Sequence, residues 1–297
     1  MTKYAKFLFV LLALISTMAL IAACGDDDDD DDDGGNTTPP PTFTADSTMG
    51  KIAAAKKMTV GVKFDQPGFG LKDPASGKVD GFDVAIAKEI AKAIGLSEDE
   101  IDFVEAVSAN RIPFLQEDKV DIVVATMTIN EDRKKQIDFS RPYYLAGQSI
   151  LVMKDNTTIK SVEDLNGKKV CSVQGSTSEK NVQAKAPQAE LLSLTGYAAC
   201  VSSMKDGRVE AVSTDDIILA GFAAADDSLK LVGGQFTQEP YGIGIKQGKD
   251  DMVEFVDTLL ANWFKDGTWD KIYNKYLGDV EGLPSAADAR AKLPPTN

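Results

Sequence analysis

Segments typical of strands alternate with segments typical of helices from about residue 49 to residue 278. The stretch "MTVGVKF" favours a strand. The stretch "GFDVAIAKEIAKAIG" has apolar residues four apart, as in an amphipathic helix: Phe82, Ile86, Ile90 and Ile94. The strands "DFVEAV" and "VDIVVATM" follow, separated by a helix over "NRIPFLQED". This strand–helix–strand order predicts an α/β protein with an open parallel sheet.

A second set of alternating segments begins at "QSILVMK" and continues through "KKVCSVQ" and "VEAVST" to "LKLVGG". The strand "YGIGIK" and two helices near residues 252–264 and 269–276 come after it. The roughly 230 residues of this region are enough to form two modest hydrophobic cores. We therefore expect two lobes, with a ligand site in the cleft between them.

The first residues have the form of an export signal that ends in a lipidation site. Lys3 and Lys6 precede an apolar run over residues 7–15, and the small residues of "IAAC" lead to Cys24. The alternative is an uncleaved membrane helix, although the run is short for a span of about 20 residues. We predict a lipoprotein signal peptide over residues 1–23 and a lipid anchor on Cys24, which holds the protein outside the cytoplasm at the cell membrane.

Residues 24–48 contain almost nothing to bury. Eight consecutive aspartates and "NTTPPPT" predict a disordered, extended tether. The aspartates resemble calcium ligands, but no fixed loop brings them together, so we expect no metal site. The formal net charge of -14 becomes -16 without the two signal lysines and -8 when the eight tether aspartates are also set aside. The folded part is therefore acidic, and we expect no nucleic-acid partner.

The chain has no histidine, which excludes Ser-His-Asp and Cys-His catalysis and the commonest metal ligand. If Cys24 is lipidated, only Cys171 and Cys200 remain, and in an oxidising compartment these two most simply pair. Two reduced core cysteines are the alternative. A disulfide between Cys171 and Cys200 would close a loop of about 30 residues, which stabilises the fold by roughly 3 to 4 kcal/mol in the chain-entropy model.

The charged segment "TINEDRKK" directly follows the buried strand "DIVV". Charge runs usually lie in solvent, and we interpret Lys134 and Lys135 in this way. However, ligands in open sheets bind beyond the carboxyl ends of strands, and Arg133 lies there. Its planar guanidinium can bond both oxygens of a carboxylate, which a lysine cannot do.

Five stretches together carry a resemblance to a known family: "GFDVAIAKEIAKAIG", "VDIVVATMTINEDRKKQIDFSRPYY", "SVEDLNGKKVCSVQGSTS", "GRVEAVSTDDIILAG" and "EPYGIGIKQG". The chain resembles the polar amino-acid binding proteins of bacterial ABC importers, solute-binding protein family 3, and is most similar to the glutamate- and aspartate-binding lipoproteins. This implies the periplasmic-binding-protein type II fold, with two open-sheet lobes joined by a two-strand hinge. The expected boundaries are 50–145 plus 240–280 for lobe 1, 146–239 for lobe 2 and 281–297 for a C-terminal tail.

The resemblance also implies a ligand site. Arg133 matches the arginine that binds the α-carboxylate of a free amino acid, and Thr128 and the backbone near Thr126 match positions that share the α groups. Ser176 and Thr177 match the second-lobe clamp on carboxylate oxygens, although ordinary helix capping explains them equally well. Asp215 matches the partner of the α-ammonium group, which leaves Asp216 to the helix dipole.

Lys63 and Arg111 match basic positions that meet the side-chain carboxylate in aspartate- and glutamate-binding relatives. Arg111 is expected at a helix start, where a cation opposes the dipole and has no capping role, so a purely structural role is less attractive. Two surface charges are the alternative. A neutral amide would leave a buried cation unpaired, so we expect glutamate or aspartate to be preferred.

The expected function is a monomeric, lipid-anchored receptor that captures glutamate or aspartate and delivers it to an ABC permease in the membrane. No catalytic residue, cofactor or metal is expected. Two alternatives share the fold: an exported enzyme similar to cyclohexadienyl dehydratase and a sensory amino-acid receptor. An enzyme would need a carboxylate or lysine as proton donor, and the sequence indicates none.

Overall fold

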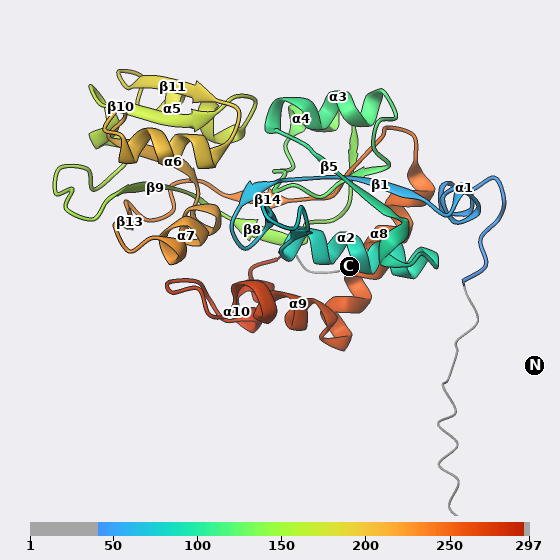
Figure 1. Cartoon of the computed structure of the whole chain (residues 1–297). Coiled ribbons are helices and arrows are strands. Elements are labelled where there is room, and N and C mark those ends of the chain that lie inside the picture. Colours follow the sequence, from blue (N-terminus) through green and yellow to red (C-terminus); the bar gives the residue numbers. More distant parts are fainter. Residues whose placement is uncertain (1–40, 294–297) are drawn as a thin grey trace, which may run out of the picture. The chain divides into compact units, whose positions relative to one another are not determined.

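The computed structural model describes residues 41–293 (Figure 1). The predicted signal peptide, Cys24 and most of the predicted tether lie outside these residues. The first helix, α1, spans Thr48–Ala55, and Ser47 caps it by accepting a hydrogen bond from the N–H of Gly50. The Phe43 ring packs edge-on against Phe255, with 5.5 Å between ring centroids. The folded part therefore begins before residue 48, where the sequence predicted tether.

The first lobe is built around a five-stranded sheet with the order β5-β1-β6-β15-β7. Its strands are β1 (Met58–Val62), β5 (Ile101–Glu105), β6 (Ile122–Val123), β7 (Asp138–Phe139) and β15 (Gly244–Ile245). β1 runs parallel to β5 and β6, whereas β15 runs antiparallel to β6 and β7. The predicted parallel sheet is thus a mixed one.

The second lobe is built around another five-stranded sheet, with the order β11-β10-β12-β9-β13. Its strands are β9 (Gln148–Met153), β10 (Lys169–Val173), β11 (Glu190–Leu194), β12 (Ala211–Asp215) and β13 (Leu229–Val232). β10 is parallel to β11 and β12, and β9 is antiparallel to β12 and β13. The helices of this lobe are α5 (Thr177–Lys185), α6 (Tyr197–Lys205) and α7 (Asp216–Ala225), with a 3-10 turn η3 at Glu163–Leu165.

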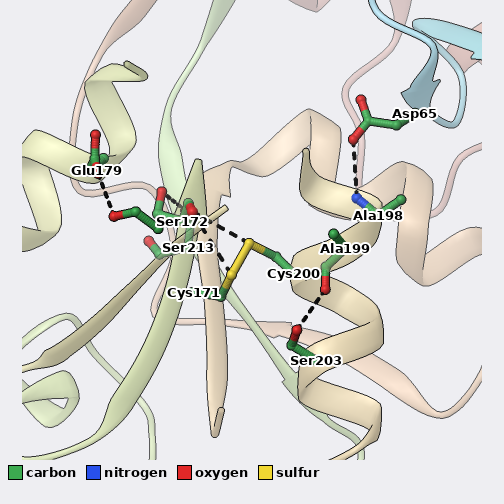
Figure 2. The surroundings of a disulfide bond; sticks show 10 residues. Asp65, Cys171, Ser172, Glu179, Ala198, Ala199, Cys200, Ser203 and Ser213 are labelled. Carbon is green, nitrogen blue, oxygen red and sulfur yellow. Dashed lines mark hydrogen bonds between the residues drawn. A yellow bond between two sulfur atoms is a disulfide. The ribbon is translucent and has the colours of Figure 1, made fainter. Parts of the chain in front are cut away.

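Cys171 on β10 and Cys200 on α6 form a disulfide, with 5.4 Å between their Cα atoms (Figure 2). This confirms the predicted pairing. Both sulfur atoms lie in a core cluster with Leu151, Val212 and Leu219. The bond therefore fastens α6 to the central strands of the second sheet.

Two strands connect the lobes: β8 (Tyr144–Ala146) carries the chain out of the first lobe and β14 (Glu239–Tyr241) carries it back. They pair antiparallel, with Tyr241 opposite Tyr144. This is the predicted two-strand hinge. The exact lobe boundaries remain a prediction.

The first lobe also contains a small sheet and most of the helices. The small sheet comprises β2 (Asp65–Gln66), β3 (Gly70–Lys72) and β4 (Val79–Asp80). The helices are α2 (Phe82–Ile94), α3 (Arg111–Gln116), α4 (Glu131–Lys134), α8 (Asp250–Asp266), α9 (Thr268–Leu277) and α10 (Ala286–Ala291), with 3-10 turns η1 (Glu98–Glu100) and η2 (Ser108–Asn110). α10 lies in the predicted C-terminal tail, where Arg290 pairs with Asp270 of α9.

The predicted apolar face of α2 is buried at all four of its positions and belongs to the largest core cluster of the described residues. Phe82 makes edge contacts with Phe69, Trp269 and Tyr273, and the last two join α2 to α9. The segment after β15 is thereby part of the first-lobe core.

Among residues 41–293, no helix combines the length and apolar character that crossing a membrane requires.

Candidate functional site

The predicted first-lobe site residues lie together because β5, β1 and β6 are adjacent and parallel, so their carboxyl ends share one sheet edge. Lys63 directly follows β1, and Arg111 is the first residue of α3. Both side chains are almost fully buried, and Lys63 Nζ donates a hydrogen bond to Ser108 Oγ at 2.9 Å. The alternative of two surface charges is therefore wrong.

Arg111 has a structural role that its position at a helix start did not indicate. Its Nη1 donates to the carbonyl oxygens of Ala125 and Thr126 at 2.9 and 3.2 Å, and its Nε donates to that of Ser108 at 3.3 Å. The side chain thus holds the loop after β6 in place. The helix dipole alone did not indicate these bonds, and a role for Arg111 in ligand binding remains a prediction beside them.

The loop held by Arg111 carries Thr126, which adopts a left-handed conformation with φ 45°. This conformation costs a non-glycine residue about 1 kcal/mol. The Asp83 carboxylate compensates by accepting the N–H of Thr126 at 2.8 Å and the hydroxyl of Tyr143 at 2.8 Å. Burial raises the pKa of Asp83 to about 7.

Arg133 lies in the short helix α4 and reaches both lobes. Its Nη1 donates to the carbonyl oxygen of Thr128 at 2.7 Å, and its Nη2 donates to that of Gly175 at 3.3 Å. Thr128 in turn lies 3.3 Å, hydroxyl to hydroxyl, from Thr177. The structure thereby brings three predicted site residues together across the cleft.

Ser176 and Thr177 stand where α5 begins, directly after β10. Ser176 caps the helix, with its Oγ accepting the N–H of Glu179 at 2.9 Å. The expected capping by Ser176 is thus present in the structure. The Ser176 hydroxyl can still donate its proton to another acceptor. A role for Ser176 in ligand binding remains a prediction.

Asp215 ends β12 and is buried at the start of α7. Its Oδ2 accepts the Tyr241 hydroxyl at 2.5 Å, whereas its Oδ1 is buried with no hydrogen-bond partner among the described residues. Burial, followed by the charge of Glu239, raises the pKa of Asp215 to about 8. A cation beside Oδ1 would satisfy the orphaned oxygen and favour the ionised carboxylate.

Lys63, Arg111 and Arg133 form no ion pair within residues 41–293, although all three are buried. Burial, and then the charge of Arg111, lower the pKa of Lys63 to about 7. Burial, and then the charge of Arg133, lower that of Arg111 to about 9. Unpaired buried cations are costly, so this arrangement suits an anionic ligand.

Sequence reasoning missed two polar neighbours of the site. Gln66 is fully buried, and its Oε1 accepts the Thr126 hydroxyl at 3.1 Å while its Nε2 has no partner in the described structure. Glu239, on hinge strand β14, accepts from Asn181 and Thr237 through Oε1 and leaves Oε2 unpaired. The only available signal was a polar residue beside an apolar stretch in each case.

A pocket of about 290 Å³ opens beside Arg133 and Gly175 and is also lined by Ser108 and Met127. A larger hollow of about 1030 Å³ lies between α4, β7 and α8 and contains none of the predicted ligand residues. In the part of the chain that the structure describes, no group of three or more acidic or cysteine side chains is placed to hold a metal ion.

The family model of bacterial extracellular solute-binding proteins, family 3, matches residues 58–279. The chain is similar to the ABC transporter glutamine-binding protein GlnH of Bacillus subtilis, with 43% identity over 269 residues, covering 90% of this chain and 96% of the relative. The glutamate-binding protein GluB of Corynebacterium glutamicum is 34% identical over 243 residues, covering 76% of this chain and 82% of the relative. The glutamine-binding relative is thus more similar in sequence than the glutamate-binding one.

Two solved structures show the same fold. An ancestral arginine-binding protein bound to glutamine gives a TM-score of 0.71 at 42% identity, covering 75% of this chain and 99% of the other. The ancestral amino acid-binding protein AncCDT-1, a precursor of cyclohexadienyl dehydratase, also gives 0.71, at 38% identity and with 77% and 99% coverage. Both neighbours are described as binding proteins.

Proposed function

Because the chain belongs to family 3 of the bacterial extracellular solute-binding proteins, we propose that it captures an acidic amino acid, glutamate before aspartate, and delivers it to an ABC importer. The observation that carries this proposal is the set of three buried cations, Lys63, Arg111 and Arg133, without ion-pair partners in residues 41–293. An amino acid with two carboxylates supplies two of the missing negative charges.

In the proposed complex, Arg133 binds the α-carboxylate and Asp215 the α-ammonium group. Support comes from the unpaired Oδ1 of Asp215 and from the guanidinium of Arg133, which spans the two lobes. Thr128 and Thr177 lie beside Arg133 and have hydroxyl groups to donate. Lys63 and Arg111 then meet the side-chain carboxylate, since both donate hydrogen bonds to Ser108 and so lie close together.

Glutamine is the second candidate ligand. Arg111 already donates to three carbonyl groups, and a lysine with a pKa of about 7 is partly neutral at physiological pH, so both residues tolerate an amide better than two free cations would. The glutamine-binding relatives favour the same reading. We retain glutamate because neutralising a buried cation contributes more than a neutral hydrogen bond.

Isothermal titration calorimetry with glutamate, aspartate, glutamine and asparagine tests the proposal. We expect the acidic members to bind tighter than their amides by about 1 to 3 kcal/mol. Arg111→Ala should reduce that difference more than it weakens recognition of the α groups. Arg208→Ala, a change at an exposed arginine paired with Asp206, is the matched control and should change neither. Glutamine binding tighter than glutamate to the parent protein would overturn the acidic assignment.

The proposal places the mature protein outside the cytoplasm, anchored through a lipid on Cys24. The support is the order of the first residues, from Lys3 and Lys6 to "IAAC". Intact-mass measurement of the membrane fraction tests this, with a mature chain that begins at a lipidated Cys24 as the expected result. A Cys24→Ser variant that remained membrane-bound and equally processed would contradict it.

A further inference from the structure

The Asp65 carboxylate, on strand β2 of the first lobe, reaches the start of helix α6 in the second lobe. Its Oδ2 accepts the N–H of Ala198 at 3.2 Å, as Figure 2 shows. A carboxylate at a helix start satisfies a free backbone N–H and interacts favourably with the helix dipole. Asp65 is not among the predicted ligand residues, although its charge acts on Lys63, which is one of them. The contact with Ala198 links the two lobes directly.

Gly196, the N-cap residue of α6, lies directly against the same carboxylate. Its backbone is extended, with φ -147° and ψ 153°, a conformation that any residue adopts without strain. A Cβ atom built on Gly196 would lie 2.5 Å from Asp65 Oδ2, which is closer than non-bonded atoms approach. A side chain at this position would therefore displace the Asp65 carboxylate from its bond to Ala198.

Gly221, inside helix α7, meets the next part of the same first-lobe segment. A Cβ atom at Gly221 would lie 2.3 Å from the carbonyl oxygen of Pro67. Glycine weakens a helix interior relative to alanine, so its presence in α7 needs a reason outside the helix. The carbonyl group of Pro67 supplies one, and it cannot rotate away as a side chain does.

The second-lobe side of this contact is rigidly held. Cys200 follows Gly196 by one helical turn and is bonded to Cys171 on β10. The disulfide therefore fixes the start of α6 on the second sheet, as Figure 2 shows. On the first-lobe side, β2 pairs with β3, and Asp65 lies opposite Leu71.

We propose that residues 65–67 of the first lobe and Gly196 and Gly221 of the second lobe form a closure contact, which exists only when the lobes close. This contact raises the affinity for every ligand by the same factor. The inference rests on the proposed function, since it requires that the protein closes around an amino acid. A contact present only in the closed state adds its free energy to binding without reading the ligand. Asp65 is therefore a positioning residue, because it holds the two lobes together and does not contact the ligand.

Gly221→Ala separates this proposal from an ordinary structural role. Alanine is the better helix former, so the ligand-free protein should melt about 2 to 4 °C higher if its lobes are open. The new Cβ atom would collide with the Pro67 carbonyl oxygen on closure, so affinities for L-glutamate and L-glutamine should both fall about tenfold to a hundredfold. Their ratio should stay constant.

Gly50→Ala is the matched control for this substitution. Gly50 also lies in a helix, α1, and its Cβ atom would lie 2.1 Å from the carbonyl oxygen of Thr44 within the first lobe. That collision is present whether the lobes are open or closed. Gly50→Ala should therefore lower the melting temperature and leave the affinity unchanged, which is the opposite pattern.

A double-mutant cycle tests the Asp65 side. Asp65→Ala and Gly196→Ala should each weaken binding about three- to thirtyfold, because each removes the bond to Ala198. The double variant should bind no worse than either single variant, since both changes break one interaction. Asp73→Ala, in the exposed turn after β3 where the carboxylate bonds only Ala75 and Ser76, is the control and should bind as the parent does.

Calorimetry on these variants with all twenty amino acids distinguishes the possible failures. A parent that binds none of them overturns the proposed function together with the closure contact. A parent that binds while Gly221→Ala binds equally well overturns the closure contact alone. A lower melting temperature of ligand-free Gly221→Ala also overturns it, because the contact would then be a permanent part of the fold.

Discussion

Replacing Arg133 with lysine removes a planar, two-pronged donor while keeping the positive charge. In the structure, Nη1 and Nη2 donate to carbonyl groups on opposite lobes, Thr128 at 2.7 Å and Gly175 at 3.3 Å. A lysine has one nitrogen and cannot bond these carbonyl groups and both oxygens of an α-carboxylate. Loss of one charge-assisted bond costs roughly 1.5 to 3 kcal/mol, which corresponds to about ten- to a hundredfold in affinity.

Titration calorimetry with L-glutamate and L-glutamine measures this loss, and both ligands should be affected alike because they share the α-carboxylate. Arg208→Lys is the control, since Arg208 is exposed and pairs only with nearby Asp206. Thermal unfolding without ligand shows whether Arg133→Lys still folds. If a folded Arg133→Lys protein bound glutamate as tightly as the parent, the assignment of the α-carboxylate to Arg133 would be wrong.

Two further predictions concern the pH dependence and the disulfide. A side-chain carboxylate should raise the pKa of Lys63 from about 7, so glutamate binding takes up a proton and the preference for glutamate over glutamine should fall as pH rises above about 7. The titration of Asp215 affects both affinities alike, because both ligands carry the ammonium group, so it cancels in the ratio of the two affinities. Titrations at pH 6.5 and 8.5 measure this ratio. A ratio that is independent of pH, or that still varies with pH in Lys63→Met, would refute the prediction. Alkylation of the denatured, non-reduced mature protein should label neither Cys171 nor Cys200, and replacing both with serine should lower the free energy of unfolding by about 3 to 4 kcal/mol in a urea titration; two labelled thiols would contradict the pairing.

Periodic segments of the fold were predictable from the sequence. The four-residue spacing of apolar residues predicted α2, and Phe82 and Ile94 mark both its buried face and its ends. The antiparallel strand β15 was not predictable as such, because strand direction depends on the path of the returning chain. The strands β2, β3 and β4 are two or three residues long, too short to show a period, and none was predicted.

The sequence predicted that Lys63 and Arg111 lie beyond the ends of strands, but it did not predict what their side chains contact. Arg111 bonds carbonyl groups 14 and 15 residues away, and no local pattern predicts such acceptors. Gly196 and Gly221 give no sign in the sequence that a segment about 130 to 150 residues earlier approaches them. Tyr241 lies in the predicted strand "YGIGIK", but its hydroxyl bond to Asp215 depends on the folding of the hinge.

A competition experiment tests the central claim, capture of an acidic amino acid, most directly. The mature protein, stripped of ligand by denaturation and refolded with its disulfide intact, is mixed with equal concentrations of glutamate, aspartate, glutamine and asparagine. Rapid gel filtration then isolates the complex, and mass spectrometry quantifies the amino acids released by a second denaturation. The account predicts that glutamate is the main amino acid recovered, with aspartate second; recovery of mainly glutamine would contradict it.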